Sequence, residues 1–109
     1  MKKMTQQSMD VTVTGTAPNE VVSCPDTDVG KGNGNVVLNW NMATAGWEIS
    51  SLDGLPDTEF TGKQKKGGTG YKCTDKNDKI QNYPYTIEVT QTTTGRKLSH
   101  DPTIRNGGP

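Results

Sequence analysis

The sequence predicts an all-β protein, an antiparallel sandwich of roughly seven to eight short strands. The strongest indication is the segment 83–91, YPYTIEVTQ, in which apolar and polar side chains alternate with the two-residue period of a strand that buries one face. The segment 36–42, VVLNWNM, shows the same alternation. Two strands of this kind can cover each other's apolar faces only in a layered β structure, and no stretch of the chain has a helical period.

The composition agrees with a single small domain. The chain has 109 residues, of which 28% are hydrophobic and 13 are glycine, and these values lean toward disorder. Against disorder, the apolar residues are grouped in alternating runs and the net charge is zero. We therefore expect a thin ordered core in residues 10–106, a flexible N-terminal tail in residues 1–9 and a flexible C-terminus in residues 107–109.

The first half of the chain is expected to form four strands. Residues 10–16 alternate valine with threonine, and residues 20–24 form a short strand that a proline ends. The glycine-rich stretch 25–35, PDTDVGKGNGN, is expected to be a flexible loop. Residues 36–42 and 47–50 then form a hairpin that carries both tryptophans.

The second half is expected to add four more strands. Residues 58–61 and 71–74 are short strands on either side of a loop rich in lysine and glycine. Ile80 is expected to pack under the approach to the strand at 83–91. Residues 98–105 form the last strand, in which a proline interrupts the pairing, as is typical of an edge strand or a bulge.

The positions of aromatic residues favour an immunoglobulin-like sandwich. Such domains place a tryptophan on the third strand and a tyrosine near the start of the sixth, and Trp40 and Tyr83 or Tyr85 occupy comparable places. The cysteines depart from the pattern, because Cys24 fits the second strand whereas Cys73 lies on the strand before the sixth. The two could lie close together, but two reduced, buried thiols are favoured over a disulfide.

Three short motifs resemble those of a known family. They are GWEI at 46–49, YPYTIEV at 83–89 and DPTIRNG at 101–107. Together they resemble the DP-EP family of small bacterial β-sandwich proteins of unknown function and, more loosely, the inclusion-body proteins of some Gram-negative bacteria. The resemblance covers residues 10–107. It implies an immunoglobulin-like sandwich, and it implies neither an activity nor catalytic residues.

Charge and hydropathy restrict partners and location. Lys+Arg and Asp+Glu both number 12, so the chain lacks the clustered positive charge that nucleic-acid binding needs. The tightest basic group, Lys63, Lys65 and Lys66, is interpreted as a solvated loop. No apolar run follows Lys2 and Lys3, and no stretch approaches the ~18 apolar residues of a membrane span. We expect a cytoplasmic protein with no nucleic-acid or membrane partner.

The inventory of reactive side chains argues against an enzyme. Ser99, His100 and Asp101 are consecutive and point to alternate faces of a strand, so they cannot form a triad among themselves. A single histidine excludes a copper electron-transfer site. A zinc site would need Cys24 and Cys73 to converge with His100 and a carboxylate. We expect no catalytic residue, no cofactor and no metal ligand.

One loop has the opening of a cation-binding motif. Residues 26–30 read D-x-D-x-G, but the twelfth position of an EF-hand loop would fall on Val37, a core-strand residue, instead of a glutamate. A looser site that shares Asp75 or Asp78 stays open, but loop residues that hydrogen-bond their own backbone are the favoured interpretation. The stretch Gly30-Lys31-Gly32 is followed by a strand instead of a helix, so it is not a phosphate-binding loop.

Two functions follow from these patterns. The first is a non-enzymatic protein that acts by protein interaction or self-association, because open sheets expose strand edges. The second is a module that binds a carbohydrate or a divalent cation. A carbohydrate site would need an aromatic ring on the solvent face, and Trp47 or Tyr71 is the candidate, but for each of them a position in the core is the favoured interpretation.

Overall fold

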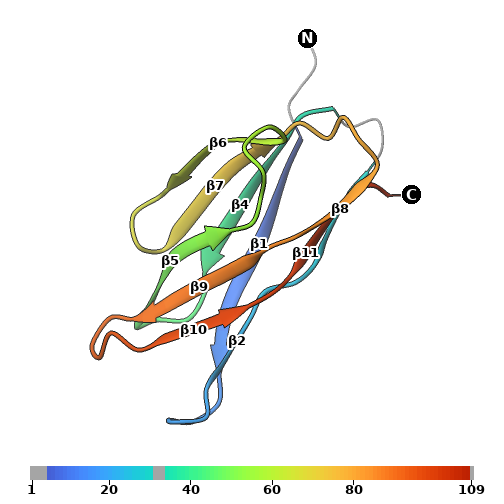
Figure 1. The fold of residues 1–109 in the computed structure, drawn as a ribbon. Helices are drawn as coiled ribbons and strands as arrows, with labels where there is room; N and C mark the ends of the chain where they lie inside the picture. The colour runs from blue at the N-terminus through green and yellow to red at the C-terminus, as the bar shows by residue number, and fades with distance from the viewer. Residues whose placement is uncertain (1–4, 31–33, 109) are drawn as a thin grey trace.

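The computed structural model describes residues 5–30 and 34–108, and these residues form β-strands and no helix (Figure 1). The strands in chain order are β1 (Thr5–Thr14), β2 (Val21–Ser23), β3 (Thr27–Gly30), β4 (Val36–Met42), β5 (Trp47–Asp53), β6 (Phe60–Lys65), β7 (Gly70–Asp75), β8 (Gln81–Pro84), β9 (Thr86–Gln91), β10 (Lys97–His100) and β11 (Thr103–Gly108). The all-β prediction is confirmed. Within the described ranges there is no helix long and apolar enough to cross a membrane.

More strands are present than the expected seven to eight because two expected strands are each divided in two and β3 lies within an expected loop. Pro84 is the last residue of β8, and Pro102 lies between β10 and β11. Proline has no N–H to donate to a ladder, so a strand is broken near it or changes its partner. Figure 1 shows β8 continuing into β9, and β10 into β11, along the length of the molecule.

The strands form three hydrogen-bonded sheets. Their orders are β2-β1-β4-β7-β6, β10-β9-β5 and β3-β11-β8. The expectation of purely antiparallel pairing is wrong for two pairs, because β1 runs parallel to β4 and β3 runs parallel to β11. All other pairs are antiparallel.

Both ends of the domain extend further than expected. Residues 5–9 were assigned to a flexible tail, but they are the first half of β1, where Thr5 pairs with Val36. On the side away from β7, the backbone N–H and C=O groups of β4 need hydrogen-bond partners. The backbone of β1 supplies them, and a backbone can do so whether its side chains are polar or apolar. At the other end, residues 107–108 belong to β11. Residues 1–4 and 109 lie outside the described part of the chain.

The expected loop at 25–35 contains a strand. Thr27 and Val29 are buried and alternate with exposed Asp26 and Asp28, so this segment pairs with β11 as strand β3. The alternation of buried and exposed residues in β3 is hard to recognise in the sequence, because the strand is short and glycines follow it. Residues 31–33, which include most of the excluded phosphate-loop stretch, lie outside the described residues.

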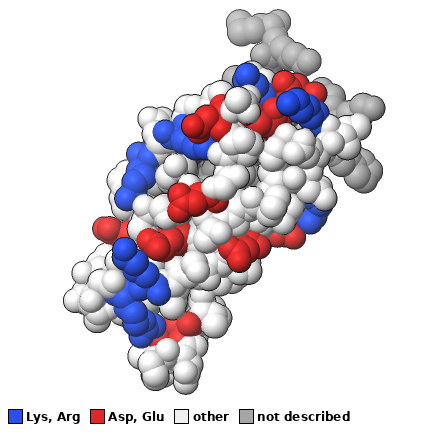
Figure 2. Space-filling model, viewed as in Figure 1, with Lys and Arg blue, Asp and Glu red and all other residues white. Residues whose placement is uncertain are grey.

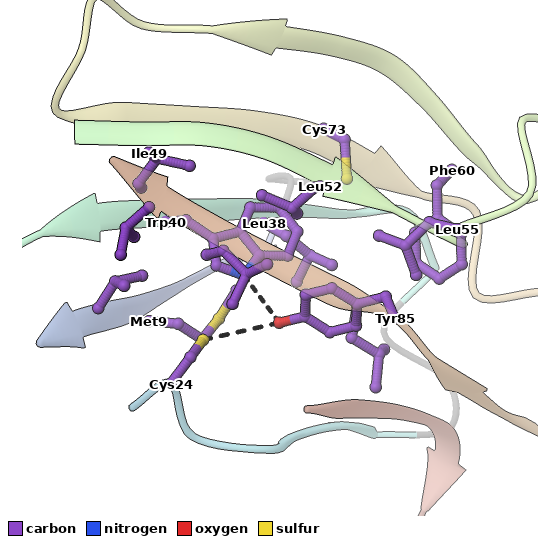
Figure 3. Close-up of a cluster of buried hydrophobic side chains, with 14 of the residues drawn as sticks. Met9, Cys24, Leu38, Trp40, Ile49, Leu52, Leu55, Phe60, Cys73 and Tyr85 are labelled. Atoms are coloured by element: carbon purple, nitrogen blue, oxygen red, sulfur yellow. Dashed lines mark hydrogen bonds between the residues drawn. The ribbon is translucent and has the colours of Figure 1, made fainter. Parts of the chain in front are cut away.

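One apolar cluster joins the sheets, and the prediction for its centre is confirmed. Trp40 and Leu38 on β4, Ile49 on β5, and Ile87 and Val89 on β9 are each 0% exposed and belong to the same cluster (Figure 3). The cluster lies between the five-stranded sheet and the sheet β10-β9-β5. Burial of this apolar surface is the main source of stability for a chain with so few hydrophobic residues.

Candidate functional site

A group of polar and acidic residues lies where β7 ends and β6 begins, at the end of the molecule that lies at the top of Figure 1. We call Glu59, Asp75, Asn77, Asp78 and Asn106 the acid–amide cluster. Asp75 is the last residue of β7 and pairs on either side with β4 and β6, whereas Asn106 lies on β11. Glu59 directly precedes β6, and the other two residues lie between β7 and β8. The cluster therefore connects the five-stranded sheet to the sheet β3-β11-β8.

Hydrogen bonds hold the cluster together. The Asn106 side-chain amide donates from Nδ2 to Asp75 Oδ1 at 2.8 Å and to Glu59 Oε2 at 3.4 Å. The backbone N–H of Asn77 donates to Asp75 Oδ1 at 2.9 Å, and that of Asp78 donates to Glu59 Oε2 at 3.3 Å. Both carboxyl groups are thus fixed through one oxygen each, and a single amide contacts both of them.

Among the described residues, three oxygens of the cluster have no hydrogen-bond partner. They are Asp75 Oδ2, Asn77 Oδ1 and Asn106 Oδ1. Asp75 is 0% exposed and Asn106 is 2% exposed, so bulk solvent does not reach these two side chains. A buried polar atom without a partner costs about 1–3 kcal/mol, and native proteins contain few of them. A hydrogen-bond donor or a positively charged group beside these acceptors would remove that cost.

The charges of the cluster are not neutralised by neighbouring side chains. Glu59 is only 3% exposed, and among the described residues no ion pair involves it or Asp75. Burial raises the pKa of both carboxyl groups, and the negative charge of Asp78 raises them further. Burial followed by the charges of these three acids also raises the pKa of Tyr83, whose hydroxyl therefore lies within their field.

A surface hollow of about 210 Å³ borders the cluster. Asn77 and Asp78 line it together with Lys79, Ile80 and Gly107. The expectation that Ile80 is covered is wrong, because it is 73% exposed at this hollow. The hollow gives a small ion or water molecule a path from solvent to Asn77 and Asp78.

The D-x-D-x-G stretch at 26–30 is occupied by contacts within the protein. Arg105 donates from Nε to Asp28 Oδ1 at 2.6 Å and from Nη1 to Asp26 Oδ2 at 3.1 Å. A hydrogen bond from the backbone N–H of Thr103, followed by the Arg105 contact, lowers the pKa of Asp26. Both carboxylates are therefore already paired, and the open alternative of a site that they share with Asp75 or Asp78 gains no support. The Gly30 carbonyl accepts a bond from Asn77 Nδ2 at 3.0 Å and so reaches the cluster.

Both cysteines are buried and free. Figure 3 shows Cys24 Sγ beside the Tyr85 hydroxyl, at 3.7 Å, and that hydroxyl accepts a bond from Trp40 Nε1 at 2.8 Å. Burial raises the pKa of the Cys73 thiol to about 12 and also raises that of Cys24. A thiol with a raised pKa is a poor nucleophile at neutral pH, which agrees with a packing role for both side chains.

The structure shows where the residues considered for catalysis and for carbohydrate binding lie. Asp101 accepts a bond from Thr86 Oγ1 at 2.7 Å, and His100 lies partly exposed on β10. Trp47 is only 6% exposed, so it packs in the core, which is the interpretation favoured over a carbohydrate-binding ring. Tyr71 is half-buried and packs edge-on against Trp40, with ring centroids 6.1 Å apart.

The basic group of the β6 edge is only partly solvated. Lys63 is half-buried, and its ammonium group donates to the Leu55 carbonyl and, at 2.7 Å, to Asp57 Oδ1. Lys65 and Lys66 are exposed, as expected. Figure 2 shows side chains of both signs along the length of the viewed face. The absence of a nucleic-acid partner stays a prediction.

Across residues 5–30 and 34–108, no three His, Cys, Asp or Glu side chains converge as a metal site. A cation at the acid–amide cluster would therefore need amide and carbonyl oxygens as ligands beside its carboxylates. Comparisons of the sequence with models of known protein families and with curated proteins give no match. The resemblance to the DP-EP family stays a prediction.

Proposed function

We propose that this chain is a non-enzymatic β-sandwich module that binds a hard divalent cation at the acid–amide cluster. The observation that carries the proposal is the pair of buried, unpartnered oxygens, Asp75 Oδ2 and Asn106 Oδ1. They lie in a cluster with the buried carboxyl group of Glu59, to which Asn106 is hydrogen-bonded. A bound cation would supply the positive charge that this group of acceptors lacks. Its bonds to the oxygens would offset the cost of burying them without hydrogen-bond donors.

The chemistry of the donors selects among cations. The cluster offers carboxylate and amide oxygens, together with the carbonyl of Gly30 held close by Asn77. Sulfur and imidazole ligands, which favour zinc and copper, are not part of it. Ca²⁺ takes six to eight oxygen ligands in flexible geometry, whereas Mg²⁺ demands a near-ideal octahedron. A set of amides and acids from several loops and strands fits Ca²⁺ better than Mg²⁺.

Terbium luminescence tests this proposal. Tb³⁺ replaces Ca²⁺ in oxygen sites, and a nearby tyrosine transfers its excitation energy to the bound ion. Tyr83 lies in the field of the cluster acids, so we expect sensitised emission that Ca²⁺ suppresses by competition. Asp75→Asn and Glu59→Gln should each abolish most of it.

The matched control for this test is Asp28→Asn. It removes a carboxylate of the D-x-D-x-G stretch at 26–30, which the Arg105 contact already occupies. The control variant should keep the full emission. Equal emission from the wild type and from Asp75→Asn would refute the site. Loss of emission in Asp28→Asn would mean that the ion binds in the loop at 26–30 instead.

We also infer that the sandwich is a variant of the immunoglobulin-like arrangement. In that fold one sheet has the order A-B-E-D and the other C-F-G. If β2, β4, β5, β6, β7, β9 and β10 are taken as A, B, C, D, E, F and G, the observed orders match, with β1 inserted between A and B. Under this assignment Trp40 lies on B and not on the third strand as expected, and the tryptophan on strand C is Trp47. The parallel pairing of β1 with β4 is a further departure from the fold.

Protein interaction or self-association stays a second candidate. It was expected because open sheets expose edges, but the edge strand β6 carries a register shift between Thr61 and Gln64 and lysines at Lys63 and Lys65. Bulges and lysines are features that discourage edge-to-edge pairing. Light scattering at high micromolar concentration tests this candidate, and a strict monomer would count against self-association. The cytoplasmic location also stays a prediction.

A further inference from the structure

The two amide side chains of the acid–amide cluster are oriented in the same way. Asn106 donates from Nδ2 to Asp75 and to Glu59. Asn77 donates from Nδ2 to the Gly30 carbonyl. In each amide the nitrogen is used, whereas the oxygen is buried and has no hydrogen-bond partner among the described residues. An amide oxygen is an acceptor with two lone pairs, so two neutral oxygen ligands lie beside the carboxyl groups.

Asn77 is held on both sides by hydrogen bonds to two different strands. Its backbone N–H donates at 2.9 Å to Oδ1 of Asp75, the last residue of β7. Its side chain donates at 3.0 Å to the carbonyl of Gly30, the last residue of β3. Because a carbonyl oxygen only accepts hydrogen bonds, the atom of the Asn77 amide that faces it is the nitrogen. The position of Oδ1 on the other side of the amide follows from this chemistry.

The backbone of Asn77 also has an unusual conformation. Its φ is 53°, in the left-handed region that asparagine adopts more readily than most other residues. The residue lines the surface hollow of about 210 Å³, and its backbone is bonded to Asp75, which is 0% exposed. Asn77 therefore connects the hollow to the buried carboxyl group.

We propose that Asn77 is the ligand that makes the cluster select Ca²⁺ over Mg²⁺. This inference rests on the proposed cation-binding function. Oxygen ligands lie roughly 0.3–0.5 Å closer to Mg²⁺ than to Ca²⁺, and Mg²⁺ demands a near-ideal octahedron. The Asn77 oxygen cannot move inward by this amount without lengthening the bond to Gly30 or the bond to Asp75. Ca²⁺ accepts longer bonds in flexible geometry, so it can use the oxygen where it lies.

Two substitutions separate the oxygen of Asn77 from the bond that holds it. Asn77→Gly removes both, and glycine adopts a positive φ without strain, so the backbone bond to Asp75 is kept. Asn77→Asp keeps an oxygen at this position but removes the donor to Gly30, because an ionised carboxylate only accepts. Asn19→Gly is the matched control. It makes the same change at an exposed position between β1 and β2, in the turn at the bottom of Figure 1.

Displacement of Tb³⁺ from the full chain by Ca²⁺ and by Mg²⁺ measures the affinity for each ion. Asn77→Gly should lower the calcium affinity by at least about tenfold and the magnesium affinity by less, so that the ratio of the two affinities falls. Asn77→Asp should bind both ions, with a lower ratio than the wild type. Asn19→Gly should keep the ratio of the wild type.

The lifetime of the Tb³⁺ emission gives a second readout, which a purely structural role of Asn77 would not change. Lifetimes in H₂O and in D₂O together count the water molecules bound to the ion. In Asn77→Gly this count should rise by about one, because water takes the place of the lost amide oxygen. In Asn19→Gly it should stay as in the wild type.

The outcomes separate this inference from the proposed function. A wild-type protein without emission that Ca²⁺ displaces would overturn the cation site and the role of Asn77 together. Displaceable emission with the same affinity ratio and water count in Asn77→Gly as in the wild type would overturn the role of Asn77 alone. A lower calcium affinity at a constant ratio and water count would do the same, because Asn77 would then support the fold without binding the ion. A lower ratio with one additional water, absent from Asn19→Gly, would support both.

Discussion

Replacing Trp40 with alanine is expected to lower the free energy of unfolding by about 3–5 kcal/mol. The side chain is 0% exposed, lies at the centre of the apolar cluster and packs edge-on against Tyr71 and Tyr85. Alanine leaves a large cavity and removes the donor for the Tyr85 hydroxyl. Small domains have only about 5–15 kcal/mol of stability in total, so the variant should be partly or largely unfolded at 37 °C. Urea denaturation followed by circular dichroism measures the change.

Two further variants calibrate this result. Tyr85→Phe keeps the ring but leaves the buried Trp40 N–H without its acceptor, which should cost about 1–3 kcal/mol. Val21→Ala changes a side chain that is 59% exposed and should stay within about 0.5 kcal/mol of the wild type. If Trp40→Ala unfolded at the same urea concentration as Val21→Ala, the account of the core would be wrong.

Calcium is expected to raise the Tm of the protein by about 10–20 °C over its value in a chelator. A ligand at 100 times its Kd stabilises the native state by about 2.7 kcal/mol, and each kcal/mol shifts the Tm of a domain of this size by about 4–8 °C. The ion would join Asp75 on β7 to Asn106 on β11, so it would stabilise the contact between two sheets. Differential scanning calorimetry at neutral pH measures the shift.

The variant Asp75→Asn isolates the cause of this shift. It should melt at one temperature whether calcium or chelator is present. The Asp28→Asn variant, whose carboxylate is bound by Arg105, should respond to calcium as the wild type does. An equal calcium response in all three proteins would mean that the ion acts elsewhere on the surface.

The core could be predicted because it depends on local alternation. In the segments around Trp40 and Ile87 every second residue is apolar, and both residues are 0% exposed. The parallel pairing of β1 could not be predicted, because Thr5 and Gln7 carry no apolar pattern and their pairing is decided by the open edge of β4. Pairing of this kind depends on backbone groups, which every residue shares.

The site could be predicted only in part. Asp75 was considered as a ligand, but with the wrong neighbours, because Arg105 follows Asp26 and Asp28 by some eighty residues and no local pattern shows that they pair. Glu59 and Asn106 were missed because they belong to two different sheets and meet only through the packing of those sheets. A usable signal was present. The two-residue period of a strand puts Asp75 on the same face as Tyr71 and Cys73. Because that face is apolar, the alternation predicts that the carboxyl group of Asp75 is buried.

A crystal structure of the protein grown with calcium tests the central claim most directly. We predict an ion in the acid–amide cluster, with Asp75 Oδ2 and at least one oxygen of Glu59 among its ligands at about 2.3–2.6 Å. The Asn106 side chain should present Oδ1 to the ion. A cluster that holds only water, with calcium bound elsewhere or not at all, would contradict the account.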